Sequence, residues 1–255
     1  MLASERHARI LDMLRAARTV RTEEIAEALS VSMETARRDL VALDRRGVLK
    51  RVHGGARNIS LVPVGDEPPF LERANTAGAA KQAIGARAAG LIVPGQTIII
   101  DVGTTALQAA RAIPLDYNGV VATCSLLAAV ELADRPNLEV LVAGGRVRAG
   151  DLALSNAQTV DFFREIHADV AFLGSGGVDA AAGLTDFYLD EAMTRRVILK
   201  NSTANFVLAD SSKFGRVARH HVADLEQIDG LISDKPLPER ILAAMRPEAR
   251  DLSVA

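Results

Sequence analysis

The sequence of 255 residues contains only one cysteine, Cys124, and has no long apolar run. A single cysteine excludes a disulfide within the chain and offers no cysteine-rich metal site. No stretch approaches the roughly 18 consecutive apolar residues of a membrane-spanning helix, and the N-terminal residues MLASERHARI lack the apolar core of a signal peptide. We therefore expect a cytoplasmic protein that binds no metal, no other cofactor and no membrane.

Charge of one sign does not dominate the whole chain, but the charge is unevenly distributed along it. Residues 1–57 contain 12 Lys and Arg against 8 Asp and Glu, a net charge of +4, whereas the other 198 residues contain 18 against 24, a net charge of −6. The length fits two domains better than one. A basic domain beside an acidic one suggests a polyanionic partner for the basic part. Many solvated domains also have a charge of +4, so this pattern needs support from motifs.

The first 57 residues are predicted to form three short helices and a β-hairpin. The second helix has Thr22 as its N-cap, and Ser32 caps the third after a tight turn. The residues VLKRVHGGAR then alternate apolar and basic side chains and turn near Gly54 and Gly55. This order is typical of a winged helix-turn-helix. The three predicted helices cover residues 4–18, 22–30 and 32 to about 46.

The third helix and the hairpin carry side chains suited to DNA. Arg37 and Arg38 can bind guanine edges or phosphates, and Thr35 can contact a thymine methyl group or a phosphate. The glycine at the hairpin tip permits close approach to the DNA backbone. An alternative is a three-helix domain whose basic residues are only solvated, with a His53 that only stabilises the turn. The residues predicted to contact DNA are Ser32, Met33, Glu34, Thr35, Arg37, Arg38, Lys50, Arg51, His53 and Gly54.

The rest of the chain is predicted to be a linker and an α/β domain. Residues 58–75 contain three prolines and no clear period, which indicates a linker between the domains. Over residues 76–255, short apolar runs such as QTIIID alternate with helical segments such as TALQAARAI. This alternation predicts a Rossmann-like, mostly parallel sheet with helices on both faces.

Four strand ends in this second domain carry groups suited to anions and hydroxyls. At the first, Asp101 ends a strand, Gly103 permits a tight turn, and Thr104 and Thr105 begin a helix whose free N–H groups suit a phosphate. The carboxyl ends of parallel strands meet at one edge of a sheet, where ligands of this architecture bind. The other three strand ends are Thr123-Cys124-Ser125, Gly144-Gly145-Arg146 and Gly174-Ser175-Gly176-Gly177.

Two lysines and an aspartate complete the predicted ligand site. Lys213 suits a phosphate or a sugar hydroxyl, and Lys81, near the start of the domain's first helix, is a second candidate phosphate partner. Each feature has a purely structural alternative, since glycine pairs often form turns and Asp210 could serve only to order its loop. The predicted ligand-binding residues are Lys81, Asp101, Gly103, Thr104, Thr105, Thr123, Ser125, Gly144, Gly145, Arg146, Gly174, Ser175, Gly176, Asp210 and Lys213.

Both domains resemble those of DeoR-type transcriptional regulators. The segment VSMETARRDLVALDRRGVLKRVHGGA resembles the family's DNA-binding signature, and DVGTT, VAGG, GSGGVDAAAGLT and ADSSKFG resemble its sensor domain, which is similar to ribose-5-phosphate isomerase. The run LTDFYLDEAMTRRVILKNS looks like the glycerol-3-phosphate-responsive branch. The resemblance implies a repressor of a carbohydrate or polyol catabolic operon. It would bind double-stranded operator DNA as a homodimer or homotetramer and be released by a phosphorylated sugar or polyol. Lys81, Asp101, Gly103, Thr104, Thr105 and Lys213 stand at the family's binding positions.

Three positions depart from the family pattern. Ala36 stands where a branched apolar residue is usual, which thins the packing under the third helix. Cys124 replaces an asparagine and so removes an amide hydrogen bond near the ligand. Asn156 stands where many members have a glycine, and asparagine tolerates a positive φ better than most residues do.

A sugar-phosphate isomerase fused to a DNA-binding domain is the main alternative function. Isomerases of the similar fold have a glutamate base eighteen residues before the lysine of their D-x-S-K loop. Here that position is Arg195, which stays protonated and cannot act as a base. Their acidic D-G-A-D loop is matched by residues 173–176 without a carboxylate, and Asp179 and Glu191 are interpreted as structural. We therefore predict no catalytic residue. A third possibility, a DNA-binding protein with a non-functional sensor, is disfavoured by the DVGTT and SSKFG loops.

Overall fold

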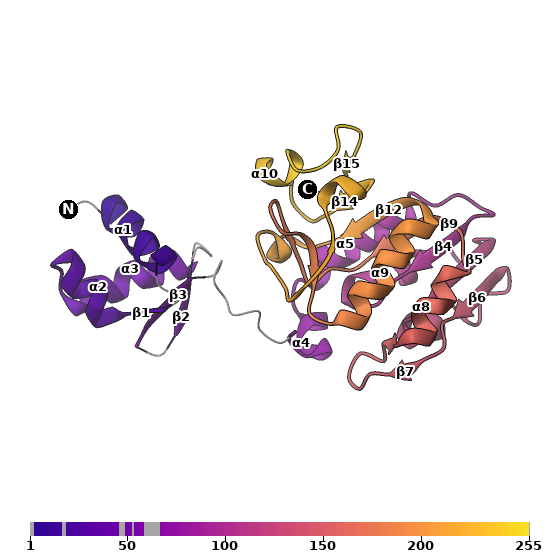
Figure 1. The fold of residues 1–255 in the computed structure, drawn as a ribbon, viewed down its shortest axis with the longest axis horizontal. Helices are drawn as coiled ribbons and strands as arrows, with labels where there is room; N and C mark the ends of the chain where they lie inside the picture. The colour runs from indigo at the N-terminus through magenta and orange to yellow at the C-terminus, as the bar shows by residue number, and fades with distance from the viewer. Residues whose placement is uncertain (1–2, 17–18, 46–48, 53, 59–66, 255) are drawn as a thin grey trace. The chain divides into compact units, whose positions relative to one another are not determined.

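The computed structural model describes residues 3–16, 19–45, 49–52, 54–58 and 67–254. The chain divides into two compact units, Met1–Gly65 and Asp66–Ala255 (Figure 1). Within the described ranges, no helix is long and apolar enough to cross a membrane.

The first unit is a three-helix domain with a small antiparallel sheet, which confirms the predicted winged helix-turn-helix. Its core contains Ile10 and Leu14 from the first helix, Ile25 from the second and Leu40 and Leu43 from the third, each at most 1% exposed. The strands β2 and β3 form the predicted hairpin. In chain order the elements are α1 (Ala3–Ala16), β1 (Thr19–Arg21), α2 (Thr22–Leu29), α3 (Met33–Arg45), β2 (Leu49–Val52) and β3 (Gly55–Asn58).

The strand β1 was not predicted, because its three residues show no period and are defined only by pairing with the distant β3. Gly55 lies at this junction, where a Cβ atom would stand 2.3 Å from the carbonyl oxygen of Val20. The prediction of Thr22 as an N-cap was wrong by one residue: Arg21 is the N-cap of α2. The Thr22 hydroxyl instead donates to the carbonyl oxygen of Gly54 at 3.1 Å and ties α2 to the hairpin.

The second unit is built on a parallel seven-stranded sheet with the order β15-β14-β12-β9-β4-β5-β6. Side chains alternate between its faces, so Ile98 and Ile100 pack on one face and Ile99 on the other. The strands are β4 (Thr97–Ile100), β5 (Gly119–Thr123), β6 (Leu138–Val142), β9 (Ala168–Leu173), β12 (Ser202–Leu208), β14 (Gly230–Ile232) and β15 (Arg250–Asp251).

Helices cover both faces of this sheet, as the alternating pattern predicted. One face packs against α5 (Gly78–Ala89), α6 (Thr104–Ala112) and α7 (Leu126–Leu132). The other packs against α8 (Ala157–Arg164) and α9 (Leu189–Asn201), which lie side by side in Figure 1. The remaining elements are an antiparallel sheet of β10 (Gly177–Asp179), β11 (Gly183–Asp186) and β13 (His220–Ala223), the pair β7 (Arg146–Val147) and β8 (Leu154–Ser155), the 3-10 helices Ser211–Lys213 and Leu225–Gln227, and α10 (Glu239–Leu242).

The segment expected to be a linker differs from the prediction in its second half. Residues 59–66 lie outside the described residues, but α4 (Phe70–Asn75) is a short helix that belongs to the second unit. This helix has no fully buried side chain. Its position depends on contacts with residues far along the chain, which a local pattern of three prolines does not reveal.

Candidate functional site

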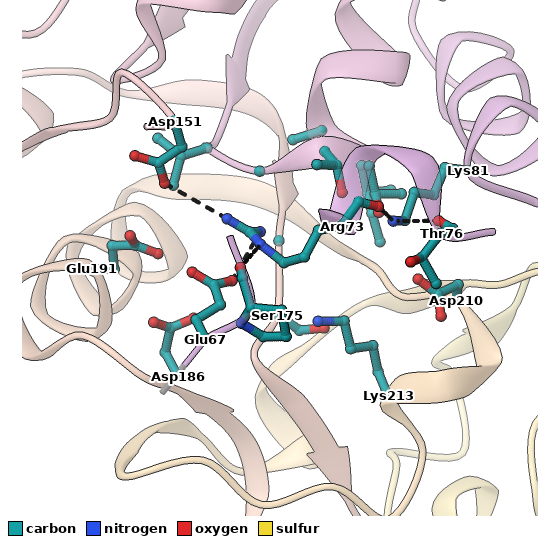
Figure 2. A pocket seen from close by; sticks show the side chains of 18 of the residues that line it. Glu67, Arg73, Thr76, Lys81, Asp151, Ser175, Asp186, Glu191, Asp210 and Lys213 are labelled. Carbon is teal, nitrogen blue, oxygen red and sulfur yellow. Dashed lines mark hydrogen bonds and ion pairs between the residues drawn. The ribbon is translucent and has the colours of Figure 1, made fainter. Parts of the chain in front are cut away.

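The carboxyl ends of β4, β9 and β12 meet at a cavity of about 180 Å³ in the second unit (Figure 2). These three strands are neighbours in the middle of the sheet, so the loops that follow them converge over its edge. The structure therefore brings together residues that are more than a hundred positions apart in the sequence. Eight of the predicted ligand-binding residues line this cavity: Lys81, Gly103, Thr104, Thr105, Gly174, Ser175, Asp210 and Lys213.

The N-terminal end of α6 forms one part of the cavity wall. Gly103 is the N-cap residue at φ +119°, a backbone conformation that L side chains rarely adopt, and it provides no side-chain cap for the first turn. Thr104 and Thr105 follow it and are both buried. A helix N-terminus without a side-chain cap presents backbone N–H groups and the positive end of the helix dipole. This wall is thus suited to an anion.

Lys213 adds a cation to the same cavity. It ends the short 3-10 helix after β12, and Asp210 accepts a hydrogen bond from the Ser212 N–H at 3.0 Å to shape this loop. Burial, with Arg216 nearby, lowers the pKa of Lys213 to about 8. The ammonium group is therefore poorly solvated, and an incoming anion would stabilise its charged form.

Lys81 lines the cavity, but its ammonium group is already engaged. It donates to the backbone carbonyl oxygens of Thr76, at 2.8 Å, and of Arg73. These carbonyls belong to the C-terminal end of α4, so Lys81 caps that helix as well as facing the site. Burial lowers the pKa of Lys81, while the charge of Asp210 opposes that shift. These two carbonyl oxygens engage two of its three N–H donors.

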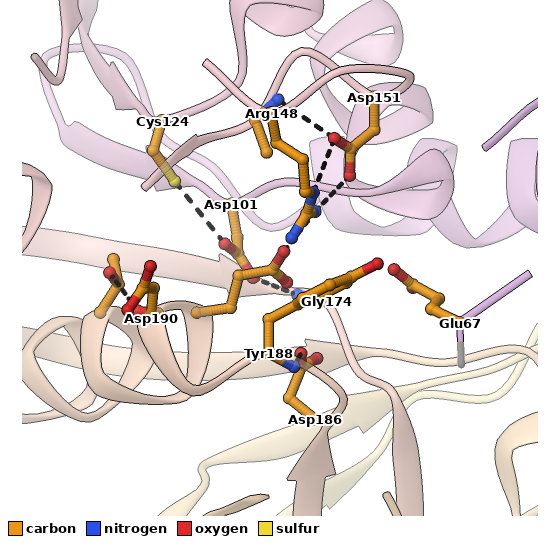
Figure 3. Close-up of polar contacts among 12 residues, drawn as sticks. Glu67, Asp101, Cys124, Arg148, Asp151, Gly174, Asp186, Tyr188 and Asp190 are labelled. Carbon is orange, nitrogen blue, oxygen red and sulfur yellow. Dashed lines mark hydrogen bonds and ion pairs between the residues drawn. The ribbon is translucent and has the colours of Figure 1, made fainter. Parts of the chain in front are cut away.

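Asp101 does not line the cavity, which differs from the prediction that it binds ligand hydroxyls. Its side chain is buried, and Oδ2 accepts from the Gly174 N–H at 2.9 Å and from Arg195 Nε at 2.5 Å. The Cys124 thiol approaches the other oxygen at 3.9 Å (Figure 3). Asp101 therefore supports the loop after β9 from below. Cys124 contacts Asp101, and neither residue lines the cavity.

The predicted residues directly after β5 and β6 do not line the cavity, which differs from the prediction that these loops share one site. Farther along the connection that follows β6, Arg148 and Asp151 do line it. Thr123 and Ser125 instead shape the start of α7: the Ser125 hydroxyl accepts from the Ala128 N–H at 3.2 Å. Gly144 accepts a hydrogen bond from the Thr159 hydroxyl at 2.8 Å. The predicted residues that do not line the cavity are Asp101, Thr123, Ser125, Gly144, Gly145, Arg146 and Gly176.

Gly145, Arg146 and Gly176 are three of the predicted residues that do not line the cavity. Gly145 has a φ of +142°, and Arg146 is exposed and 3.8 Å from Asp190. The Gly176 N–H donates to the Thr185 carbonyl oxygen within the small sheet. Asn156 adopts an extended backbone rather than the positive φ expected from the family's glycine, and its side chain caps α8 by accepting from the N–H groups of residues 158 and 159.

A buried ion-pair network, missed in the sequence, lies under and beside the cavity. Arg195 is 2% exposed and pairs with Asp101, Asp186 and Glu191. Arg148 pairs with Asp151 and Glu191 and lies over the Tyr188 ring, 3.9 Å from its centre (Figure 3). Arg195, the residue that the sequence analysis expected at the place of the isomerase base, is thus a cation with three carboxylate partners.

Glu191 is the carboxylate in the cavity wall that most resembles a base. Burial and the neighbouring Asp186 raise the pKa of Glu191, and Arg195 and Arg148 oppose that shift. Each of its two oxygens pairs with a guanidinium group, Oε2 with Arg195 at 3.0 Å and Oε1 with Arg148. These contacts hold Glu191 as part of the wall, as the structural interpretation of this residue expected.

Other cavity residues that the prediction missed come from the segment expected to be a linker. Glu67 and Arg73 form an ion pair at 2.8 Å, and both lie against the cavity with Thr76. Arg216, after the Lys213 loop, also lines it. The sequence gives only a weak signal for this pair, since Glu67 and Arg73 are six positions apart and their burial depends on the tertiary structure.

In the first unit, three of the predicted DNA-contacting residues of α3, Glu34, Arg37 and Arg38, are exposed, whereas Thr35 is half-buried and Met33 packs against the core. Arg37 and Arg38 are exposed, and Arg38 Nε lies 3.2 Å from Glu34 of the preceding turn. The Ser32 hydroxyl caps the helix by accepting from the Thr35 N–H at 3.2 Å. A groove is lined by Met33 and Arg37 from α3 together with Arg51 and Gly54 from the hairpin. His53 and the side chain of Lys50 lie outside the described residues.

The opposite side of α3 is anchored to α1. Asp39 is buried and pairs with Arg6 at 2.7 Å and with His7 at 3.1 Å. The hydrogen bond from Arg6 lowers the pKa of Asp39. Ala36 is fully buried in the same core. These contacts orient α3 so that its two adjacent arginines face outward.

Two protein-family models match the chain. The DeoR-like helix-turn-helix domain matches residues 6–61, and the DeoR C terminal sensor domain matches residues 76–235. The chain belongs to the DeoR family of transcriptional regulators. It is therefore a DNA-binding transcriptional regulator and not an enzyme.

Similar regulators span the whole chain. The glycerol-3-phosphate regulon repressor of Escherichia coli (strain K12) is 31% identical over 245 residues, which cover 96% of each chain. The HTH-type transcriptional regulator GolR of Listeria innocua is 31% identical over 255 residues and the full length of both chains. A ribose 5-phosphate isomerase A from Methanocaldococcus jannaschii aligns with 55% of this DeoR-family chain and 55% of its own chain, at a TM-score of 0.41 and 17% identity.

Proposed function

We propose that this DeoR-family regulator is a repressor that binds a phosphorylated sugar or polyol in the cavity and then loses affinity for its operator. The observation that carries this proposal is the convergence of the α6 N-terminus and Lys213 on one small cavity. Backbone N–H groups, a helix dipole and a poorly solvated ammonium group together favour a phosphoryl group. Thr104 and Thr105 add hydroxyl donors to the same wall.

The rest of the cavity suits a polyhydroxylated carbon chain. Asp186, Glu191 and Asp151 present carboxylates, which accept hydrogen bonds from hydroxyl groups (Figure 2). The Ser175 hydroxyl is buried and, among the described residues, has no hydrogen-bond partner. A buried hydroxyl without a partner is costly, so a ligand oxygen at this point would stabilise it. The proposed phosphoryl end and hydroxyl end together define the ligand class.

The names of the relatives suggest which effector molecules to test first. The Escherichia coli relative is named as a repressor of the glycerol-3-phosphate regulon. Glycerol 3-phosphate has one phosphoryl group and two hydroxyls, which a cavity of about 180 Å³ with these groups would accommodate. We therefore propose glycerol 3-phosphate and phosphorylated polyols of similar size as the first effectors to test, and carbohydrate or polyol catabolic genes as the targets.

On the DNA side, we propose a symmetric homodimer or homotetramer that inserts two α3 helices into adjacent major grooves. A symmetric oligomer matches a palindromic operator, and Arg37, Arg38 and Thr35 would contact bases and phosphates. To weaken operator binding 100-fold, the effector must favour the state with low DNA affinity by about 2.7 kcal/mol.

An operator-binding titration tests this function. Operator duplexes are first selected from random sequences with the purified protein, and binding is then measured by fluorescence anisotropy with a panel of phosphorylated sugars and polyols. The unphosphorylated counterparts serve as controls. We expect at least one phosphorylated compound to weaken operator binding by 10-fold or more, in line with typical coupling energies. Equal binding with every compound of the panel would contradict the proposed effector class.

A further inference from the structure

One wall of the cavity is formed by the segment Glu67–Thr76, which directly precedes α5. Glu67, Arg73 and Thr76 all line the cavity from this segment (Figure 2). A second cavity, lined by Pro69 and Phe70 among others, lies against the same segment. The segment Glu67–Thr76 is therefore a single layer of chain that borders two cavities.

Polar contacts hold this segment in place. Lys81 donates to the carbonyl oxygens of Arg73 and Thr76. Arg73 donates to the Pro68 carbonyl oxygen at 2.9 Å and pairs with Glu67 at 2.8 Å. No side chain of α4 is fully buried, and Leu71 is 75% exposed. A segment that buries so little apolar surface belongs to the least stable parts of a fold.

The Glu67 carboxylate lies among the cations that would receive a phosphoryl group. Its side chain is only 10% exposed, and it lines the cavity together with Arg73, Lys213 and Arg216. The charges of Arg73 and Lys213 favour its ionised form, although burial raises the pKa of Glu67 overall. A phosphoryl group bound to Lys213 would meet this carboxylate at close range in a poorly solvated site. Two anions cannot share these cations without a large electrostatic penalty.

Building on the function proposed above, we propose that the Glu67 carboxylate is an internal competitor of the effector's phosphoryl group, so that effector binding expels Glu67 and releases the Glu67–Thr76 wall from the cavity. Arg73 would then turn from Glu67 to the phosphoryl group.

The displacement of Glu67 can affect DNA binding because Glu67 lies close in sequence to the DNA-binding unit. The last strand of the DNA-binding unit, β3, ends at Asn58, and Glu67 is only nine positions further along the chain. Displacing Glu67 therefore moves the point at which the chain leaves the sensor unit. Effector binding at the phosphoryl site would in this way change the conformation of the segment that connects the sensor unit to the DNA-binding unit.

The substitution Glu67→Gln in the full-length chain tests the competition. It removes the negative charge and keeps the size of the side chain. With glycerol 3-phosphate as the probe, calorimetry should show roughly 10-fold tighter binding than to the wild-type chain, because like charges in a desolvated site repel strongly. Without any ligand, hydrogen exchange in residues 67–76 should be faster in the variant, and its operator affinity should be reduced.

Glu226→Gln is the matched control, because it removes the same charge from the second unit at an exposed side chain that does not line the cavity. Its effect on probe binding should be about 2-fold or less, as for other exposed charges. The inference is overturned if Glu67→Gln binds the probe no more tightly than wild type, or if Glu226→Gln has an equal effect. A wild-type chain that binds no phosphorylated compound of the panel would overturn the proposed function itself, and this inference with it.

Discussion

Arg195 Nε donates to Asp101 Oδ2 at 2.5 Å, and both side chains are almost completely buried. The two residues are 94 positions apart and join the end of β4 to the middle of α9. Asp101 also accepts from the Gly174 N–H, so this pair fixes the loop after β9 that carries Ser175. The floor of the cavity is thus supported by an ion pair rather than by an apolar core.

Replacing Arg195 by alanine should destabilise the second unit by roughly 3–5 kcal/mol, because it leaves buried carboxylates without their cation. Asp101, Asp186 and Glu191 all lose this partner. The free energy of unfolding can be measured with urea and circular dichroism. The adjacent Arg196→Ala is the control: that side chain is exposed, and about 1 kcal/mol or less is expected. Similar losses in both variants would contradict the structural role given to Arg195.

Effector affinity should fall as the pH rises from 7.5 to 9.5. The pKa of Lys213 in the free protein is lowered to about 8, and a bound phosphoryl group favours the protonated lysine. Below pH 8 the charged form is already present, whereas above it each binding event must take up a proton. The affinity should therefore fall toward about 10-fold per pH unit at the upper end of this range. Calorimetry in two buffers with different ionisation enthalpies should detect the proton uptake.

The variant Lys213→Arg separates the titration of Lys213 from other effects of pH, since arginine stays charged between pH 7.5 and 9.5. The variant should bind the effector with an affinity that changes little between pH 7.5 and 9.5. A decline as steep as that of the wild-type chain would assign the pH dependence to another group.

Lys213→Ala should abolish effector-dependent release and leave operator binding without effector within about 3-fold of wild type. The side chain belongs to the sensor unit, and its loss removes a charge-assisted hydrogen bond to the proposed phosphoryl group, commonly about 1.5–3 kcal/mol. Fluorescence anisotropy with and without effector measures both quantities in one experiment. Normal release from operator in this variant would refute the assignment of Lys213.

Arg37→Ala should weaken operator binding by about 1–3 kcal/mol, because Arg37 is exposed on α3 next to the groove between helix and hairpin. Arg9→Ala removes the same charge from an exposed position on α1 and should cost less than about 0.7 kcal/mol, as expected for a surface charge away from the groove. Anisotropy titrations at one fixed salt concentration compare the two. If Arg37→Ala binds operator like wild type, another element is the recognition helix.

Local sequence patterns predicted most of the secondary structure. Helical spacing and caps such as Ser32 placed α3 within one residue at each end, and the alternation of apolar runs predicted the parallel sheet. The loop DVGTT predicted the α6 N-terminus after a tight turn at Gly103, whose φ in the structure is +119°. These features depend on neighbours within a few residues, so they can be deduced before the fold is known.

Which loops share a cavity was decided only by the tertiary structure. Residues directly after β4, β9 and β12 line the cavity, whereas those directly after β5 and β6 do not, and no local pattern encodes this sheet order. Arg148 and Asp151, farther along the connection after β6, also line it.

The amino-acid sequence by itself indicated two domains, the helices and hairpin of the first, the main parallel strands of the second and the family to which the chain belongs, because periodicity, caps and motifs are local properties. Only the folded chain decided that Asp101 supports Arg195, that Lys81 caps α4, and that Glu67 lies among the cations of the site. The physical reason is that burial and charge pairing join residues far apart in sequence, and their energies exist only once the sheet has brought them together.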